Sequence, residues 1–267
     1  LNRDAAGEGV SVRGGFAELL RKSYLAEVIS KPESELVRTV NDWVASKTND
    51  KIRDLISSPD FLACLVNAVY FRSDWRFPFD ADATRDGTFH NADKTRSTVP
   101  LMHMTENLDY YSDKDCQIVR LPYADGQYSM LVALGSYTGS LADYAARLTD
   151  TRVALTLPRF ELEYDVSLKD ALMALGMTKC FSDAAELDEM FENTSVCISD
   201  VIHKTYLHVT ESGTEAAAAT AVMVRATGLL PEDEPVAFTA DRPFSWCIVE
   251  NGTGNVLFCG TVNQLGK

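Results

Sequence analysis

Residues Glu211 to Ala226 read Glu-Ser-Gly-Thr-Glu-Ala-Ala-Ala-Ala-Thr-Ala-Val-Met-Val-Arg-Ala. Ala, Glu, Met and Arg all favour helices, so propensity alone predicts a helix. Every second residue from Thr214 to Ala226 is uncharged, however, whereas Glu215 and Arg225 fall on the other parity. Because a strand sends alternate side chains to opposite faces, the stretch also fits a sheet with its small residues inward. The sequence leaves both interpretations open.

Composition bounds the class of protein. The chain has 267 residues, is 46% hydrophobic and shows no long linker or repeat, so we expect a single domain over residues 1–267. The net charge of −14 argues against nucleic acid or an anionic membrane as a partner of the whole surface. No run of eighteen apolar residues occurs, so no membrane-spanning helix is predicted.

The hydrophobic pattern predicts an α+β fold with antiparallel sheets, because helices come first and strands later without regular alternation. We expect helices at 11–29, 34–56, 143–148 and 168–175, and a buried strand at 61–71. Further strands are expected at 153–162 and 199–209, the latter running directly into residue 211. Hairpins are expected within 96–134 and around Asn251-Gly252, between 244–249 and 255–262.

Motifs for enzyme chemistry are missing from the sequence. It contains no Gly-x-Ser-x-Gly elbow, no His-Glu-x-x-His and no phosphate loop. The four histidines are too few and too scattered to suggest a metal site. We therefore expect neither catalysis nor a metal or other cofactor.

Cysteines and glycosylation sequons bear on the compartment. Six cysteines occur without a Cys-x-x-Cys pair, and apolar flanks around Cys64 and Cys259 predict buried free thiols. Sequons begin at Asn193 and Asn251, each a candidate glycosylation site. The sequons favour an extracellular, secreted protein, whereas unpaired cysteines would suit a cytoplasmic one equally well.

Several motifs occur in order along nearly the whole chain. They are Asn41-Asp42-Trp43-Val44 with Thr48, Asn67-Ala68-Val69-Tyr70-Phe71 with Trp75, Leu121-Pro122-Tyr123, Leu157-Pro158-Arg159-Phe160, His203-Lys204, Glu211-Ser212-Gly213-Thr214-Glu215, Asp241-Arg242-Pro243-Phe244 and Leu257-Phe258-Cys259-Gly260. In these motifs the chain resembles the serpin (serine protease inhibitor) superfamily. The resemblance implies a large central sheet, smaller sheets, surrounding helices and an exposed reactive-centre loop. It also implies that the first helices of the family, which would precede Leu1, are missing here.

The resemblance implies a suicide inhibitor of serine proteases rather than an enzyme. A protease attacks the loop at residues 211–238, forms an acyl-enzyme, and is trapped when the cut loop inserts into the central sheet as a strand. The hinge would span 211–221, and its implied residues are Glu211, Gly213, Thr214, Glu215, Ala216, Ala217, Ala218, Ala219 and Thr220. Its small inward face, free of proline until Pro231, suits insertion.

Spacing from the hinge, as in inhibitory members, implies a scissile bond between Thr227 and Gly228. Thr227 would suit elastase-like proteases. Cleavage between Arg225 and Ala226 would instead suit trypsin-like proteases, and Leu229 or Leu230 would suit chymotrypsin-like ones. These alternatives stay open.

Three further positions gain roles from the resemblance. Asn67 and His203 match a buried polar pair that holds the central strands where the sheet parts, and Trp75 matches the place where the loop first enters. A monomer is expected, and the acidic balance argues against heparin. The alternative function is a non-inhibitory carrier or chaperone. The four consecutive alanines favour inhibition, because non-inhibitory members tend to carry bulky, charged or proline residues in the hinge.

Overall fold

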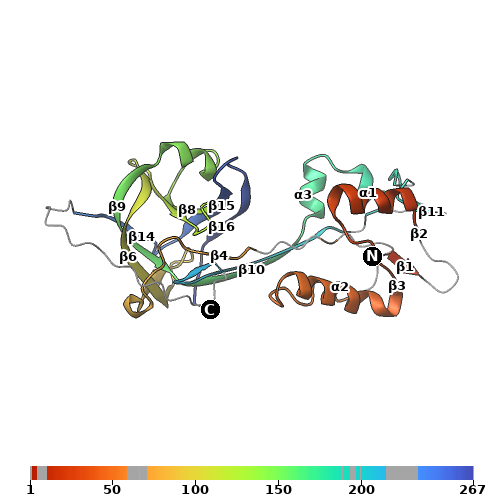
Figure 1. Cartoon of the computed structure of the whole chain (residues 1–267), viewed down its shortest axis with the longest axis horizontal. Helices are drawn as coiled ribbons and strands as arrows, with labels where there is room; N and C mark the ends of the chain where they lie inside the picture. The colour runs from red at the N-terminus through yellow and green to blue at the C-terminus, as the bar shows by residue number, and fades with distance from the viewer. Residues whose placement is uncertain are drawn as a thin grey trace. The chain divides into compact units, whose positions relative to one another are not determined.

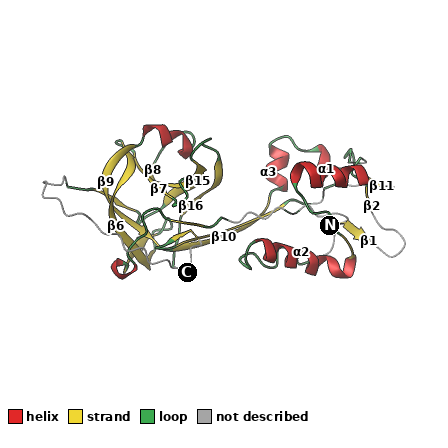
Figure 2. Cartoon of the chain, viewed as in Figure 1, coloured by secondary structure: helices red, strands yellow, loops and turns green. Residues whose placement is uncertain are grey.

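The computed structural model describes residues 2–4, 11–58, 66, 71–187, 189–192, 197–198, 200–214 and 234–266. The chain forms two compact units, Leu1–Tyr70 with Leu162–Tyr206 and Phe71–Glu161 with Leu207–Lys267 (Figure 1). The α-helices α1, α2 and α3 lie in the first unit, whereas the second is built mainly of strands (Figure 2). The expectation of one domain over 1–267 stays a prediction.

The described residues of the first unit form three α-helices, one 3-10 helix and short strand pairs. Their bounds are α1 Gly14–Tyr24, α2 Glu33–Lys47, α3 Lys169–Ala174 and the 3-10 helix η3 Lys179–Phe181. Strand β1 (Asn2–Asp4) pairs in parallel with β3 (Ser30–Pro32), and β2 (Ser11–Val12) pairs antiparallel with β11 (Phe191–Glu192).

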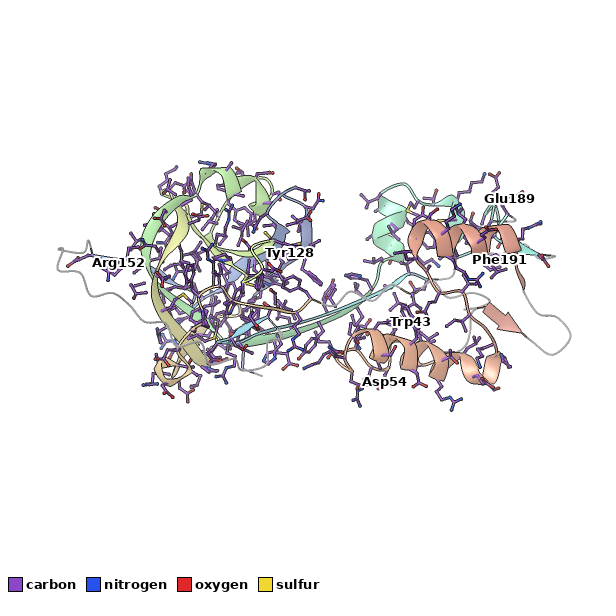
Figure 3. The ribbon with its side chains drawn as sticks, viewed as in Figure 1. Trp43, Asp54, Tyr128, Arg152, Glu189 and Phe191 are labelled. Carbon is purple, nitrogen blue, oxygen red and sulfur yellow. The ribbon has the colours of Figure 1, made fainter. Side chains whose placement is uncertain are left out.

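Helix α2 carries the core of the first unit on one face. Its Val40 and Val44 pack with Ile52, Ile56 and Tyr206. On the same helix Trp43 (labelled in Figure 3) donates from its indole nitrogen to Glu27 over 3.0 Å. The helical spacing of the apolar residues therefore predicted the buried face correctly.

Both long helices are shorter than the sequence predicted. The helix expected at 11–29 ends at Tyr24, because Leu25 takes a left-handed backbone with φ of 52°. The helix expected at 34–56 ends at Lys47. There the Thr48 hydroxyl donates to Val44 O and accepts from Ile52 N, closing a turn that returns the chain to the helix. Apolar residues beyond the turn stay in the core without helical structure, which is why the pattern appeared continuous.

The second unit is built around an eight-stranded sheet with the order β14-β9-β6-β7-β8-β15-β16, and β5 pairs with β6. The bounds are β5 Arg85–His90, β6 Arg96–Ser112, β7 Cys116–Pro122, β8 Tyr128–Gly135, β9 Thr149–Pro158, β14 Val236–Thr239, β15 Phe244–Glu250 and β16 Val256–Val262. Strands β14 and β9 are parallel, and the other pairs are antiparallel. The hairpins predicted within 96–134 and around Asn251-Gly252 are confirmed.

The structure adjusts two smaller predictions and confirms a third. The helix expected at 143–148 is the 3-10 helix η2, Leu141–Arg147, which packs against β8 and β15. The strand expected at 153–162 is two strands, β9 and β10 (Phe160–Ser167), separated at Arg159. The helix expected at 168–175 is confirmed as α3, and Gly176 follows it with φ of +102°, a conformation that suits glycine.

A four-stranded sheet has the order β10-β12-β13-β4, with bounds β12 Ile202–Val209, β13 Gly213–Thr214 and β4 Ser73–Asp74. The prediction that the strand at 199–209 runs directly into residue 211 is wrong. Thr210 N donates to Gly213 O over 2.9 Å, so the chain reverses and β13 pairs antiparallel with β12. The strand predicted at 61–71 lies outside the described residues except for Val66 and Phe71.

The combination of helices, a large mixed sheet and a smaller sheet confirms the predicted α+β class. Among the described residues, no helix is both long enough and apolar enough to cross a bilayer.

Candidate functional site

Strand β13 lies between β12 and β4, at the start of the stretch that decides the fold. Thr214 pairs with Val209 on one side and with Ser73 on the other, and Gly213 pairs with Asp74. Gly213 and Thr214, two of the predicted hinge residues, therefore occupy a strand position. The chain from 215 to 233 lies outside the described residues.

A buried aromatic pair lies beside this strand. The Thr214 side chain is fully buried, and its hydroxyl oxygen lies 2.7 Å from the hydroxyl of the equally buried Tyr123. Trp75 stacks on Tyr123 with ring centroids 4.5 Å apart and planes 11° apart. The Trp75 indole nitrogen donates to Thr210 O over 2.9 Å. Trp75 and Tyr123 thus contact both ends of the reversal between β12 and β13.

Burial also keeps the Tyr123 hydroxyl protonated. It raises the pKa of the Tyr123 phenol, and the hydrogen bond to Thr214 opposes that rise only in part. Tyr123 therefore stays a neutral hydroxyl that can donate or accept. The contact between Tyr123 and Thr214 therefore holds no buried charge.

Glu211 anchors the reversal from its outer side. Arg159 donates to the Glu211 carboxylate through Nε over 3.2 Å and through Nη2, and Thr84 donates its hydroxyl over 2.8 Å. The Glu211 side chain is only 12% exposed. Burial raises the pKa of this carboxyl, but the hydrogen bonds from Arg159 and Thr84 outweigh it, so the pKa is lowered overall. Glu211 is accordingly an ionised group held by a positively charged partner.

Two backbone hydrogen bonds complete the anchor. Trp75 N donates to Ser212 O and Phe79 N donates to Glu211 O, each over 2.9 Å. Both the side chain and the carbonyls of the reversal are thus fixed before the chain reaches Thr214.

The structure brings together Glu211, Gly213, Thr214 and Trp75 from the predicted site. His203 lies half-buried on β12, and its expected partner Asn67 is outside the described residues, so that pair stays a prediction. Also outside the described part are Glu215, Ala216, Ala217, Ala218, Ala219, Thr220, Arg225, Ala226, Thr227, Gly228, Leu229 and Leu230, together with Asn193.

Asn251, the second sequon, lies on the exposed turn between β15 and β16. Its amide nitrogen donates to Gly126 O over 3.0 Å, and its amide oxygen accepts from Ser129 over 2.8 Å. The side chain therefore has a structural role in joining two turns.

Three residues of the site were missed by sequence reasoning. Tyr123 and Arg159 lie inside motifs that carried the resemblance, but the sequence assigned neither of them a role. Thr84 had no signal at all, because a threonine in a polar loop is ordinary. All three act through contacts across more than 50 residues of sequence, with separations of 91, 52 and 127.

The described ranges hold no cluster of three or more His, Cys, Asp or Glu side chains that could bind a metal ion. Their five cysteines are free thiols. Cys259 is exposed, so the prediction that it is buried is wrong; its strand, β16, is the last in the sheet order. Cys64 lies outside the described residues.

The chain belongs to the serpin family. A sequence model of the family described as "Serpin (serine protease inhibitor)" matches residues 2–265. The fold of both sheets is therefore that of a serpin.

Three known proteins illustrate the likeness. An uncharacterized serpin-like protein, TK1782, of Thermococcus kodakarensis is 34% identical over 269 residues, covering 94% of this chain and 63% of its own length. A protein of Cyanea capillata named serine protease inhibitor is 32% identical over 268 residues, covering 91% of this chain and 70% of its own length. The solved structure of human thyroxine-binding globulin complexed with thyroxine is 26% identical, with a TM-score of 0.85, covering 97% of this chain and 72% of that chain. This chain thus spans about two thirds of the length of the relatives it matches.

Proposed function

We propose that this protein inhibits serine proteases as a monomer, by loop cleavage, acyl-enzyme trapping and insertion of the loop into the central sheet. The observation that supports the proposal is β13: Gly213 and Thr214 already lie between β12 and β4, with the Thr214 side chain inward. Residues 215 onward would extend this strand once the loop is cut.

The register between β12 and β13 predicts which residues would pair if the loop inserted. Continued along β12, the antiparallel pairing of Thr214 with Val209 would place Ala216 opposite Leu207 and Thr220 opposite His203. Strand β12 has eight residues, and each ladder hydrogen bond contributes about 0.5–1.5 kcal/mol. Hydrogen bonds to β12 alone would therefore stabilise the inserted state by several kcal/mol, which favours insertion after cleavage.

Composition supports the same step. Residues on the parity of Thr214 are small or apolar up to Ala226, so none needs to bury a charge. The four consecutive alanines remove side-chain bulk that would obstruct passage between two paired strands. Proline, which cannot donate to a ladder, first occurs at Pro231, beyond the proposed cut.

The bait bond in this proposal is Thr227–Gly228, and the partner is an elastase-like protease. A trypsin-like partner would cut after Arg225, and a chymotrypsin-like partner after Leu229 or Leu230. We further propose secretion, supported by the two sequons; release of a glycan by an endoglycosidase would test this.

A carrier function is the second candidate, because thyroxine-binding globulin has a similar fold. The test uses the full-length protein and one protease of each class. Inhibition predicts a complex with protease that survives SDS and a released C-terminal peptide that begins at Gly228. Cleavage without a complex would overturn inhibition and favour the carrier. A peptide beginning at Ala226 would overturn only the Thr227 assignment.

A further inference from the structure

Two free cysteines lie directly opposite each other in the β15–β16 hairpin. Cys247 of β15 pairs in register with Cys259 of β16. Directly opposed residues of an antiparallel pair share one face of the sheet, so both thiols lie on the same side. Neither residue takes part in the loop-insertion mechanism proposed above.

The backbone spacing of such a pair suits a disulfide. Opposed residues in antiparallel strands have Cα atoms roughly 4.5 or 5.5 Å apart, depending on the hydrogen-bonding position. A disulfide spans Cα separations of about 4.4–6.8 Å, so either position allows the bond without separating the strands. The Cβ atoms of opposed residues are about 4.5–5.5 Å apart, and those of a disulfide about 3.5–4.5 Å, so closure draws the strands together slightly.

The two thiols differ in access to solvent. Cys247 is 2% exposed and belongs to a cluster with Leu131, Leu141 and Tyr144 beneath η2. Cys259 is exposed. Burial, with a smaller effect from Cys259, raises the pKa of Cys247 to about 12. An oxidant dissolved in water therefore reacts first with the exposed Cys259 thiol. The buried Cys247 stays a protonated thiol opposite it.

We propose that Cys247 and Cys259 form a site of reversible oxidation that takes a peroxide as its substrate. Hydrogen peroxide transfers one oxygen to the Cys259 sulfur, giving a sulfenic acid and water. The Cys247 sulfur then attacks the Cys259 sulfur, the S–O bond breaks, and the oxygen leaves as a second water with the Cys247 proton. Each sulfur loses one electron and the peroxide gains two. A dithiol reductant reverses the bond by thiol–disulfide exchange.

The test oxidises reduced, folded full-length protein with a small excess of hydrogen peroxide, blocks the remaining thiols with N-ethylmaleimide and maps the digest by mass spectrometry. The expected product is a peptide pair joined through Cys247 and Cys259 that is two hydrogen masses lighter than its reduced components. Dithiothreitol should return both thiols together. Cys197, an exposed cysteine outside the β15–β16 hairpin, provides the control. Cys197→Ser should leave the cross-link unchanged, and Cys259→Ser should abolish it.

The register itself is tested by unfolding. Protein oxidised in guanidinium should lose the preference for this pair, because the strands no longer oppose the thiols. Two results would overturn the proposal: Cys259 converted to sulfinic acid while Cys247 remains a free thiol, or Cys259 joined mainly to another cysteine in the folded protein.

Discussion

The hydroxyl oxygens of Tyr123 and Thr214 lie 2.7 Å apart, in a place where neither side chain is exposed to solvent. The Thr214 side chain has therefore exchanged water for a protein partner, as the Glu211 side chain has before it, and it has done so at a fully buried strand position. Thr214 is also the first of the alternate residues, from 214 to 226, that carry no charge. The position from which insertion would proceed is thus a specific, hydrogen-bonded contact.

Replacing Thr214 with Arg should convert an inhibitor into a substrate. The new guanidinium would face the Trp75–Tyr123 pair, where an unpaired charge costs several kcal/mol to bury. Insertion would stall, and the protease would deacylate and leave. The measurement is the ratio of SDS-stable complex to cleaved protein, and we expect at least a tenfold fall.

Glu215→Arg is the matched control for this charge. The alternation predicts that residue 215 lies on the outward parity, so the same side chain one position later should leave the ratio of complex to cleaved protein nearly unchanged. If Thr214→Arg and Glu215→Arg behave alike, the inward and outward assignment is wrong.

Tyr123→Phe should lower the free energy of unfolding by about 1–3 kcal/mol. The variant leaves the buried Thr214 hydroxyl without its partner but keeps a ring for Trp75 to stack on. Guanidinium unfolding measures the loss. Tyr164, 57% exposed, is the control, and Tyr164→Phe should change stability by no more than about 0.5 kcal/mol. Equal effects from the two variants would contradict a buried hydrogen bond at Tyr123.

Glu211→Gln should destabilise the protein at neutral pH and lose this effect in acid. Folding lowers the pKa of the Glu211 carboxyl below its ordinary value of 4.5. The ionised carboxylate therefore stabilises the fold at pH values above 4.5. The contribution disappears as pH falls below 4.5 through the lowered value. The thermal midpoint of the wild type should therefore exceed that of the variant at pH 7 and approach it as the pH falls well below 4.5. A difference that grows in acid would contradict the assignment.

Gly135→Ala should be much more costly than Gly126→Ala. Both glycines have positive φ, +86° and +70°, so alanine carries a backbone cost of about 1–2 kcal/mol at each. At Gly135 a Cβ atom would also lie 2.2 Å from Asp115 O, whereas nothing lies within 4 Å at Gly126. We expect a further loss of about 1–3 kcal/mol at Gly135 from this overlap. Thermal unfolding of both variants measures it, and equal losses would refute the close approach of Gly135 to the Asp115 carbonyl oxygen.

Local patterns in the sequence predicted much of the fold. The hairpins between β6 and β8 and between β15 and β16 follow from apolar runs separated by turn residues. The buried face of α2 follows from Val40 and Val44 at helical spacing. The extent of α2 could not be predicted this way, because Ile52 and Ile56 are buried through a turn at Thr48 rather than through helical continuation.

The candidate site was only half predictable. Glu211, Thr214 and Trp75 were singled out through the resemblance. The partners of Glu211 and Thr214 depend on contacts between distant segments, which no local pattern encodes. Arg159 contacts Glu211 because the chain breaks between β9 and β10, and the hydrophobic pattern predicted one continuous strand there. The reversal at Thr210 was missed for a similar reason: β13 has only two residues, too few for periodicity.

The most direct test of loop insertion is thermal unfolding of the protein before and after its loop is cut by a protease that is not trapped. The wild type and Thr214→Arg are compared, each as the intact chain and as the purified cleaved product. If residues 215 onward extend β13 between β12 and β4, the cleaved wild type should unfold at a clearly higher temperature than the intact chain, and cleaved Thr214→Arg should gain much less. A cleaved wild type that unfolds at the same or a lower temperature would contradict insertion.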